Sequence, residues 1–251
     1  MTRVTKRLAL ASSLLLCAHV ASAQTADQVV EKSLAALGGR AALVKLKTRA
    51  STGTITLLTP LGEVSGSIET FNAAPNKSRT LIKADLSSLG AGPLVLDQRF
   101  DGKSGYIMDS LQGNREMSGG QLEALKNGSF PHPFLNYKEM GASVTVSGKE
   151  KVGERDAYLL LIEHPTGPVV RLLVDAESYL PVKTIIKVEV PQLGRDVEQS
   201  TEMLDYREVD GIKLPYRLKV SSSVQNFTVE IAKIEHNVPI DDALFSKPAT
   251  P

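Results

Sequence analysis

Histidines and paired carboxylates are the side chains that most often hold a metal ion or transfer a proton, and this chain has few in suggestive positions. After residue 23 it has three histidines: His132, His164 and His236. They lie about 30 and about 70 residues apart, without the His-x-x-x-His or His-Glu-x-x-His spacing that places two zinc ligands on one helix face. A zinc site would have to assemble from distant segments, and we predict no metal site.

Motifs of nucleophilic and cofactor-dependent enzymes are also missing. No Gly-x-Ser-x-Gly occurs, and Ser65-Gly66-Ser67 falls in a predicted strand, where a nucleophile is poorly presented. Gly90-Ala91-Gly92 lacks the third glycine of a dinucleotide-binding turn. Asp241-Asp242 fits the cap of a short helix better than a calcium loop. We therefore predict no catalytic residue, no cofactor and no enzymatic activity. The alternative is a hydrolase whose histidines meet acids only after folding.

Charge and composition exclude further classes of protein. The chain has 251 residues, of which 42% are hydrophobic and 23% charged, as in ordinary folded proteins. Its 29 Lys and Arg balance 28 Asp and Glu, so a protein that grips nucleic acid through phosphate contacts is not expected. The length fits one large all-β domain or two small ones. No linker divides it, and we predict one domain.

The first 23 residues have the pattern of an export signal. Three basic residues lie among the first seven, residues 8–20 are mostly apolar, and Ala21-Ser22-Ala23 supplies a small-x-small cleavage pattern. The apolar stretch is shorter than the ~20 residues that span a bilayer. We predict cleavage after Ala23, which leaves residues 24–251 with a net charge of −2. Cleavage also removes Cys17, the only cysteine, and an exported domain without disulfides fits the bacterial periplasm.

The next segment, residues 25–46, has helical spacing. Its apolar positions are Val29, Val30, Leu34 and Leu37, Asp27 is a candidate N-cap, and Gly38-Gly39 breaks the helix. The apolar stripe is narrow, which predicts a helix that lies on another layer.

From Thr48 onward the hydrophobic period becomes two, as in strands. Residues 64–71 and 94–100 are examples, and similar stretches up to Glu235 make about eleven strands. Turn signals separate them: Pro60-Leu61-Gly62, Asp101-Gly102, Gly153-Glu154-Arg155 and Asp210-Gly211. Strands joined by tight turns predict an antiparallel meander.

Residues 118–141 interrupt this alternation. Gln121–Asn127 is a candidate helix that starts near Ser118 or Gly119, and Leu135–Met140 is a second. Between them lies Phe130-Pro131-His132-Pro133-Phe134, whose aromatic side chains we expect to be exposed.

A sheet of so many strands twists and curls, so the fold class is mainly β (α+β), with a single strongly curved antiparallel sheet. Its concave side either is filled by side chains or holds a ligand, and the residues leave both open.

Several motifs resemble the LolA/LolB-like superfamily of periplasmic lipoprotein-sorting proteins, in particular its outer-membrane lipoprotein-sorting-like members. They are VVEK and AALGGR within residues 29–40, FDGK at 100–103, MSG at 117–119, DYREVDGIKLP at 205–215 and NVPIDDALF at 237–245. The similarity spans roughly residues 25–248. It implies an unclosed barrel whose N-terminal and mid-chain helices form a lid over an apolar cavity. It also implies an arginine that latches the lid, for which Arg49 and Arg79 are both candidates.

The resemblance therefore implies a periplasmic, non-enzymatic carrier or chaperone. It would bind a lipid or the acyl chains of lipoproteins for transport toward the outer membrane, because each CH₂ kept from water is worth ~0.8 kcal/mol. Partners would be a lipid or lipidated protein and, transiently, membrane proteins of the envelope, and the chain would be a monomer. The alternative is an envelope interaction module with a filled barrel and no small ligand.

Strand alternation predicts which residues face this cavity, and a one-residue error in the alternation would exchange the two faces of a strand. The predicted cavity lining is Val64, Ile68, Leu94, Leu96, Phe100 and Tyr106. The predicted lid residues are Phe130, Phe134 and Leu135.

Overall fold

A computed structural model describes residues 24–190 and 194–248. The export signal predicted over residues 1–23 lies outside the described residues.

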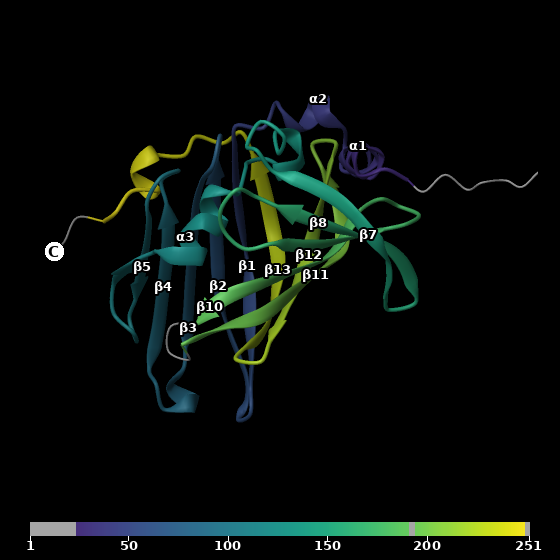
Figure 1. The fold of residues 1–251 in the computed structure, drawn as a ribbon. Helices are drawn as coiled ribbons and strands as arrows, with labels where there is room; N and C mark the ends of the chain where they lie inside the picture. The colour runs from purple at the N-terminus through teal and green to yellow at the C-terminus, as the bar shows by residue number, and fades with distance from the viewer. Residues whose placement is uncertain (1–23, 191–193, 249–251) are drawn as a thin grey trace, which may run out of the picture.

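Thirteen strands in the described part of the chain form one antiparallel sheet (Figure 1). Their order across the sheet is β6-β5-β4-β3-β2-β1-β13-β12-β11-β10-β9-β8-β7. The strands are β1 Thr48–Thr59, β2 Gly62–Ala73, β3 Lys77–Asp85, β4 Pro93–Phe100, β5 Gly105–Asp109, β6 Arg115–Glu116, β7 Ser143–Val152, β8 Arg155–Glu163, β9 Val170–Asp175, β10 Pro181–Val190, β11 Arg195–Val209, β12 Ile212–Ser222 and β13 Asn226–His236.

The order of the strands decides the path of the chain. It runs outward from β1 to the edge strand β6, continues at the opposite edge with β7, and returns to β13, which pairs with β1. The two edges do not pair with each other, so the sheet is an unclosed, curved layer, as predicted. Because β6 and β7 lie at opposite edges, residues 117–142 must cross one face of the sheet. We call them the crossing segment.

The predicted meander is confirmed, and each of the four turn signals joins two adjacent antiparallel strands. The expected number of about eleven strands is too low. One strand that the sequence did not indicate is β6, whose two residues are too few to show alternation.

The helices agree with the predictions except at two points. They are α1 Ala26–Ala36, α2 Arg40–Leu43 and α3 Gly119–Lys126, with 3₁₀ turns at Ser87–Leu89, Pro133–Leu135 and Asp242–Leu244. The N-cap of α1 is Thr25 rather than Asp27, because Thr25 and Gln28 form a capping box. The second helix predicted in the crossing segment, Leu135–Met140, does not form: a 3₁₀ turn covers Pro133–Leu135, and residues 136–141 are turns. Asp241 does cap the last turn, by accepting a hydrogen bond from Ala243 N at 2.9 Å.

Register partners trace one face of the sheet from strand to strand, since alternate residues point to opposite faces. One such row runs through Leu160, Leu172, Thr184, Thr201, Val220, Phe227, Leu57 and Val64. We call this the inner face, because its residues on β8 and β9 pack against α1 and the crossing segment.

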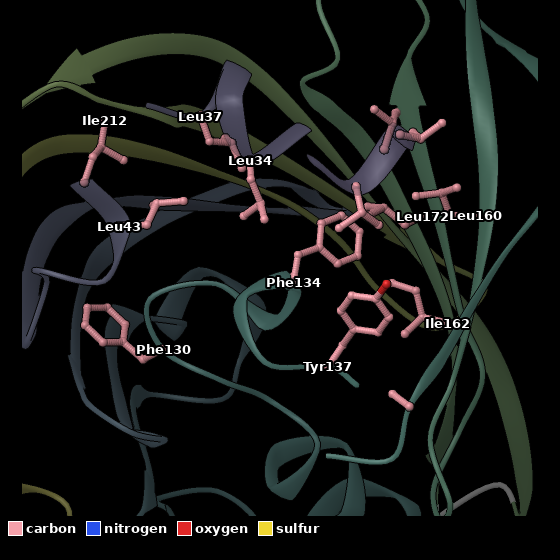
Figure 2. Close-up of a cluster of buried hydrophobic side chains, with 14 of the residues drawn as sticks. Leu34, Leu37, Leu43, Phe130, Phe134, Tyr137, Leu160, Ile162, Leu172 and Ile212 are labelled. Carbon is pink, nitrogen blue, oxygen red and sulfur yellow. The ribbon is translucent and has the colours of Figure 1, made fainter. Parts of the chain in front are cut away.

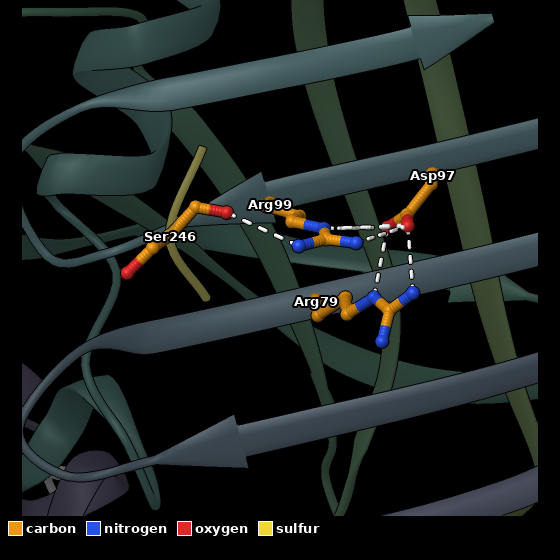
Figure 3. Close-up of polar contacts among 4 residues, drawn as sticks. All are labelled: Arg79, Asp97, Arg99 and Ser246. Atoms are coloured by element: carbon orange, nitrogen blue, oxygen red, sulfur yellow. Dashed lines mark hydrogen bonds and ion pairs between the residues drawn. The ribbon is translucent and has the colours of Figure 1, made fainter. Parts of the chain in front are cut away.

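The outer face carries a buried ionic cluster that holds the C-terminal residues (Figure 3). Asp97 accepts hydrogen bonds from Arg79 at 2.9 and 2.6 Å and from Arg99 at 2.9 Å, and Arg99 also donates to the Ser246 carbonyl at 3.2 Å. Burial alone would raise the pKa of Asp97, but the two guanidinium groups hold it below its ordinary value.

Gly53 offers a test of the β1–β13 pairing. An added Cβ would lie 2.2 Å from the Glu230 carbonyl oxygen on β13, where the register shifts. Gly53→Ala should therefore reduce the free energy of unfolding by roughly 2 kcal/mol or more, as overpacking does. Gly120→Ala, which meets nothing within 4 Å, is the control and should change it by less than about 1 kcal/mol. Equal effects in chemical denaturation would contradict the close approach of these strands.

Candidate functional site

The largest apolar assembly on the inner face lies under α1 and the crossing segment (Figure 2). We call it the inner cluster. Its buried members are Val29, Val30, Leu34, Leu37, Leu43, Leu46, Phe130, Phe134, Tyr137, Ala142, Leu160, Ile162, Leu172, Val174 and Ile212. Figure 2 shows side chains from α1, the crossing segment and the strands pointing toward one another. The apolar stripe predicted for α1 therefore faces the sheet.

The crossing segment fills the space over the inner face with its own aromatic side chains. Phe130 and Phe134 are 8% and 1% exposed, so the expectation that they are exposed is wrong. Both lie in the inner cluster, Leu135 packs against it, and Tyr137 meets Phe134 edge-on at 6.3 Å between ring centroids. The structure thus brings the three predicted lid residues together. Tyr137 is not among the predicted lid residues, and its spacing of three from Phe134 is the signal in the sequence that could indicate it.

Polar contacts hold the crossing segment at several points along its length. Near α3, the Asn76 side chain donates to the Leu125 and Lys126 carbonyls at 2.8 and 3.1 Å. Phe130 N donates to Pro75 O at 2.9 Å on the side of β2 and β3. On the other side the Tyr137 hydroxyl donates to Asp27 of α1 at 2.7 Å, and Arg40 donates to the Leu135 carbonyl at 2.9 Å. The cover therefore consists of two segments, α1 and the crossing segment, that are bonded to each other.

The two arginines left open as latch candidates lie on different faces. Arg49 of β1 lies on the inner face, with its guanidinium 5.4 Å from the ring centroid of Phe130. No hydrogen bond or ion pair of the Arg49 guanidinium is found among residues 24–190 and 194–248, and burial lowers the pKa of Arg49. Arg79 is bound to Asp97 on the outer face. Of the two, Arg49 alone touches the crossing segment.

His132 lies two residues after Phe130 in the crossing segment, and the charge of Arg49 also acts on its pKa. Its Nδ1 accepts a hydrogen bond from Phe134 N at 3.2 Å. Burial, and secondarily the charge of Arg49, lowers the pKa of His132 to about 4. The imidazole is thus neutral at pH 7 while the segment covers the inner face.

Five of the six residues predicted to line a cavity share the inner face, but not one cluster. Val64 and Leu94 pack with Ala84 and Leu86, whereas Ile68 packs with residues of β1 and β13. Two others lie on the same face of β4: Leu96 and the fully buried Phe100.

Tyr106 lies on the opposite face from these five. Its register partner is Arg99, an outer-face residue, and Lys247 Nζ lies 5.3 Å from its ring centroid.

Neither of two hollows within the described residues is lined by any of the nine predicted residues. One of about 780 Å³ lies between Gly120 of α3, residues 167–169 and strands β8–β11. The other, of about 410 Å³, lies where α2 meets the β11–β12 turn and the end of β13.

The histidines do not assemble a catalytic or metal centre. His236 Nδ1 lies 3.0 Å from Asp210 Oδ2 beside the smaller hollow, but His132 and His164 line neither hollow. In the part of the chain that the structure describes, no three His, Cys, Asp or Glu side chains gather closely enough to hold a metal ion.

Comparisons with known proteins bear on the fold. No family model matches the chain, and no curated protein matches it. Among solved structures, a LolA superfamily protein from Nitrosomonas europaea matches with a TM-score of 0.56 and 14% identity, over 90% of this chain and 99% of that one. The chain has a LolA-like fold.

Two further structures agree with this LolA-like fold. A DUF1329 family protein from Desulfovibrio piger has a TM-score of 0.56 and 11% identity, over 88% of this chain and 97% of that one. A domain from Vibrio parahaemolyticus named for outer membrane lipoprotein sorting has a TM-score of 0.54 and 10% identity, over 86% and 94%. At these identities the likeness concerns the fold.

One observation bears on membrane association. No helix within the described ranges combines the length and the apolar character needed to cross a bilayer.

His132→Asn tests whether the crossing segment buries a neutral imidazole. In the unfolded chain His132 binds a proton with a pKa of ~6.5, whereas in the native protein its pKa is about 4. The free energy of unfolding should therefore fall as pH falls through this window. Asn can accept the bond from Phe134 N without titrating. Between about pH 7 and about pH 4.5 the wild type should lose up to about 2 kcal/mol more than the variant in chemical denaturation. Parallel curves would mean that His132 is solvated.

Proposed function

We propose that this chain is a non-enzymatic carrier or chaperone that binds a lipid, or the acyl chains of a lipidated protein, against its inner face. The observation that carries the proposal is the inner cluster: an apolar face of an open sheet that is covered by two segments, α1 and the crossing segment, which are not strands of that sheet. The LolA-like fold supports the same reading. An acyl chain would replace side chains of the crossing segment in their contacts with β8 and β9.

The compartment and the partners belong to the same proposal. The signal pattern before Gln24 supports export to the periplasm, and carriage of acyl chains there supports transport toward the outer membrane. Partners would be a lipid or lipidated protein and, in passing, envelope membrane proteins that deliver or receive it. Balanced charge supports the absence of a nucleic-acid partner, and we propose a monomer.

Opening of the cover would involve Arg49. Its guanidinium makes a cation–aromatic contact with Phe130 of the crossing segment, and the resemblance implies a latching arginine. We assign that role to Arg49 as part of this proposal. The crossing segment would then move away as its aromatic side chains leave the inner cluster.

A second candidate function is an interaction module for an envelope complex. It is favoured by the filling of the inner cluster, in which Phe134 and Leu160 are almost completely buried. Such a module would bind no small ligand and would keep its cover closed.

Extraction of the purified protein with organic solvent, followed by mass spectrometry, separates these functions. The carrier should yield an acyl compound. After delipidation, addition of a long-chain fatty acid or an acylated lipoprotein should raise the thermal unfolding temperature by mass action. Absence of both an extracted compound and any stabilisation would support the interaction module instead.

Two matched substitutions test whether an acyl chain displaces the crossing segment. Phe134 and Phe245 are each 1% exposed, but only Phe134 belongs to the inner cluster. Phe134→Leu and Phe245→Leu should each lower the free energy of unfolding by about 1–2 kcal/mol. Only Phe134→Leu should increase the affinity for hexadecanoate, about fivefold, because less packing must be given up. The measurement is isothermal titration, and equal affinities in both variants would contradict displacement of Phe134.

A further inference from the structure

Tyr179 adopts a backbone conformation that bulky residues avoid. Its φ is 59°, in the left-handed region, within the turn that joins β9 to β10. The Asp175 carboxylate already orders this turn by accepting hydrogen bonds from Glu177 N at 3.1 Å and Ser178 N at 2.7 Å. Glycine is the usual residue at such a position of a hairpin loop. The turn itself does not require a tyrosine at this position. Contacts of the Tyr179 side chain must therefore offset the strain of its backbone.

The ring of Tyr179 connects the inner cluster to two lysines. It stacks on Tyr158 with 6.1 Å between ring centroids and an interplanar angle of 18°, and both tyrosines pack against the inner cluster. Lys32 Nζ of α1 lies 4.7 Å from the Tyr179 centroid and donates to its hydroxyl at 3.1 Å. Lys149 Nζ of β7 lies 4.7 Å from the Tyr158 centroid. The apolar bodies of the tyrosines face the cluster, and their hydroxyl ends reach the edge of the cover.

Few acidic side chains offset the positive charges of the two lysines beside these tyrosines. Neither Lys32 nor Lys149 makes an ion pair within the residues that the structure describes. Asp156, whose pKa Lys149 helps to lower, is itself paired with Lys151 at 2.9 Å. The hydrogen bond from Lys32 is also the main cause that lowers the pKa of the Tyr179 hydroxyl, followed by the bond from Gln24. Two ammonium groups and two phenols thus lie at one border of the apolar cluster without a carboxylate of their own.

We propose that Lys32, Tyr158 and Tyr179, with Lys149 beside them, form a site for the anionic head group of an amphiphile whose acyl chain lies in the inner cluster. This rests on the proposed acyl binding and names its ligand class: a single-chain or multi-chain lipid with a carboxylate or phosphate. Lys32 and the hydroxyls donate hydrogen bonds to the anion, and charge-assisted bonds of this kind are the strong ones. The positive charge of Lys149, beside Tyr158, attracts the anionic head group electrostatically.

The test compares hexadecanoate, hexadecyl phosphate and uncharged hexadecanol by isothermal titration of the delipidated protein, residues 24–251. The wild type should bind both charged probes about tenfold more tightly than hexadecanol, with a preference that shrinks as salt rises. Lys32→Gln/Lys149→Gln should remove the preference and leave the affinity for hexadecanol unchanged. The control is Lys83→Gln/Lys219→Gln, which removes the same charge from two exposed lysines of β3 and β12 and should keep the preference. Whichever charged probe binds better identifies a carboxylate or a phosphate as the preferred head group.

Failure of this site can be told from failure of acyl binding. If hexadecanol binds as tightly as the charged probes, the head-group site is overturned while the carrier proposal stands. If none of the three probes binds, acyl binding is overturned. Titration with inorganic phosphate then tests the head-group site separately. Phosphate that shifts the ring resonances of Tyr158 and Tyr179 in the wild type, but not in Lys32→Gln, supports the site. Rings that do not respond overturn it.

Discussion

The pairing of the first strand with the last is the constraint on which the rest of this structure depends. Because β1 and β13 lie side by side at the centre of the sheet, the two meanders end at opposite edges, β6 and β7. The chain between them has no short route and must pass over a face of the sheet. A face that is crossed by a chain segment can be apolar without being exposed to water. The cover of the inner face is therefore a consequence of topology, and its aromatic residues are what make that cover stable.

Much of this fold could be predicted because strand alternation and turn chemistry are local signals. The Asp210-Gly211 turn, the stripe of Leu34 and Leu37 on α1, and the common face of Val64 and Ile68 all depend on neighbours within a few residues. The pairing of β1 with β13 joins residues nearly the whole chain apart, such as Arg49 and His236, and no local pattern records it. The resemblance to LolA-like proteins, and not periodicity, carried the expectation of an open sheet with a lid.

The candidate site was less predictable, for physical reasons that particular residues illustrate. Phe130 and Phe134 stand among prolines in a stretch without periodicity, which is typical of an exposed loop, and they are buried only because the segment crosses a sheet that lies elsewhere in sequence. Tyr106 was placed with Phe100 although the Asp101–Ser104 turn separates them, so alternation could not be carried from one to the other. Tyr179 has no sequence signal at all, since its strained backbone and its stacking on Tyr158 arise from tertiary contacts.

The energetics of the cover set a lower limit on the size of a ligand that could displace it. Burying a large apolar side chain is worth about 1.5–3 kcal/mol, so releasing Phe130, Phe134 and Leu135 together costs on the order of 8 kcal/mol. At ~0.8 kcal/mol per methylene, about ten methylenes must be buried to offset this loss. For the proposed carrier, short apolar compounds would therefore leave the crossing segment in place, whereas acyl chains of more than about ten methylenes would replace it. In the proposed carrier Arg49 would oppose this release, because its guanidinium contacts Phe130 of the crossing segment. With a long acyl chain bound, the apolar contacts that cover the inner face would be exchanged for contacts with the acyl chain.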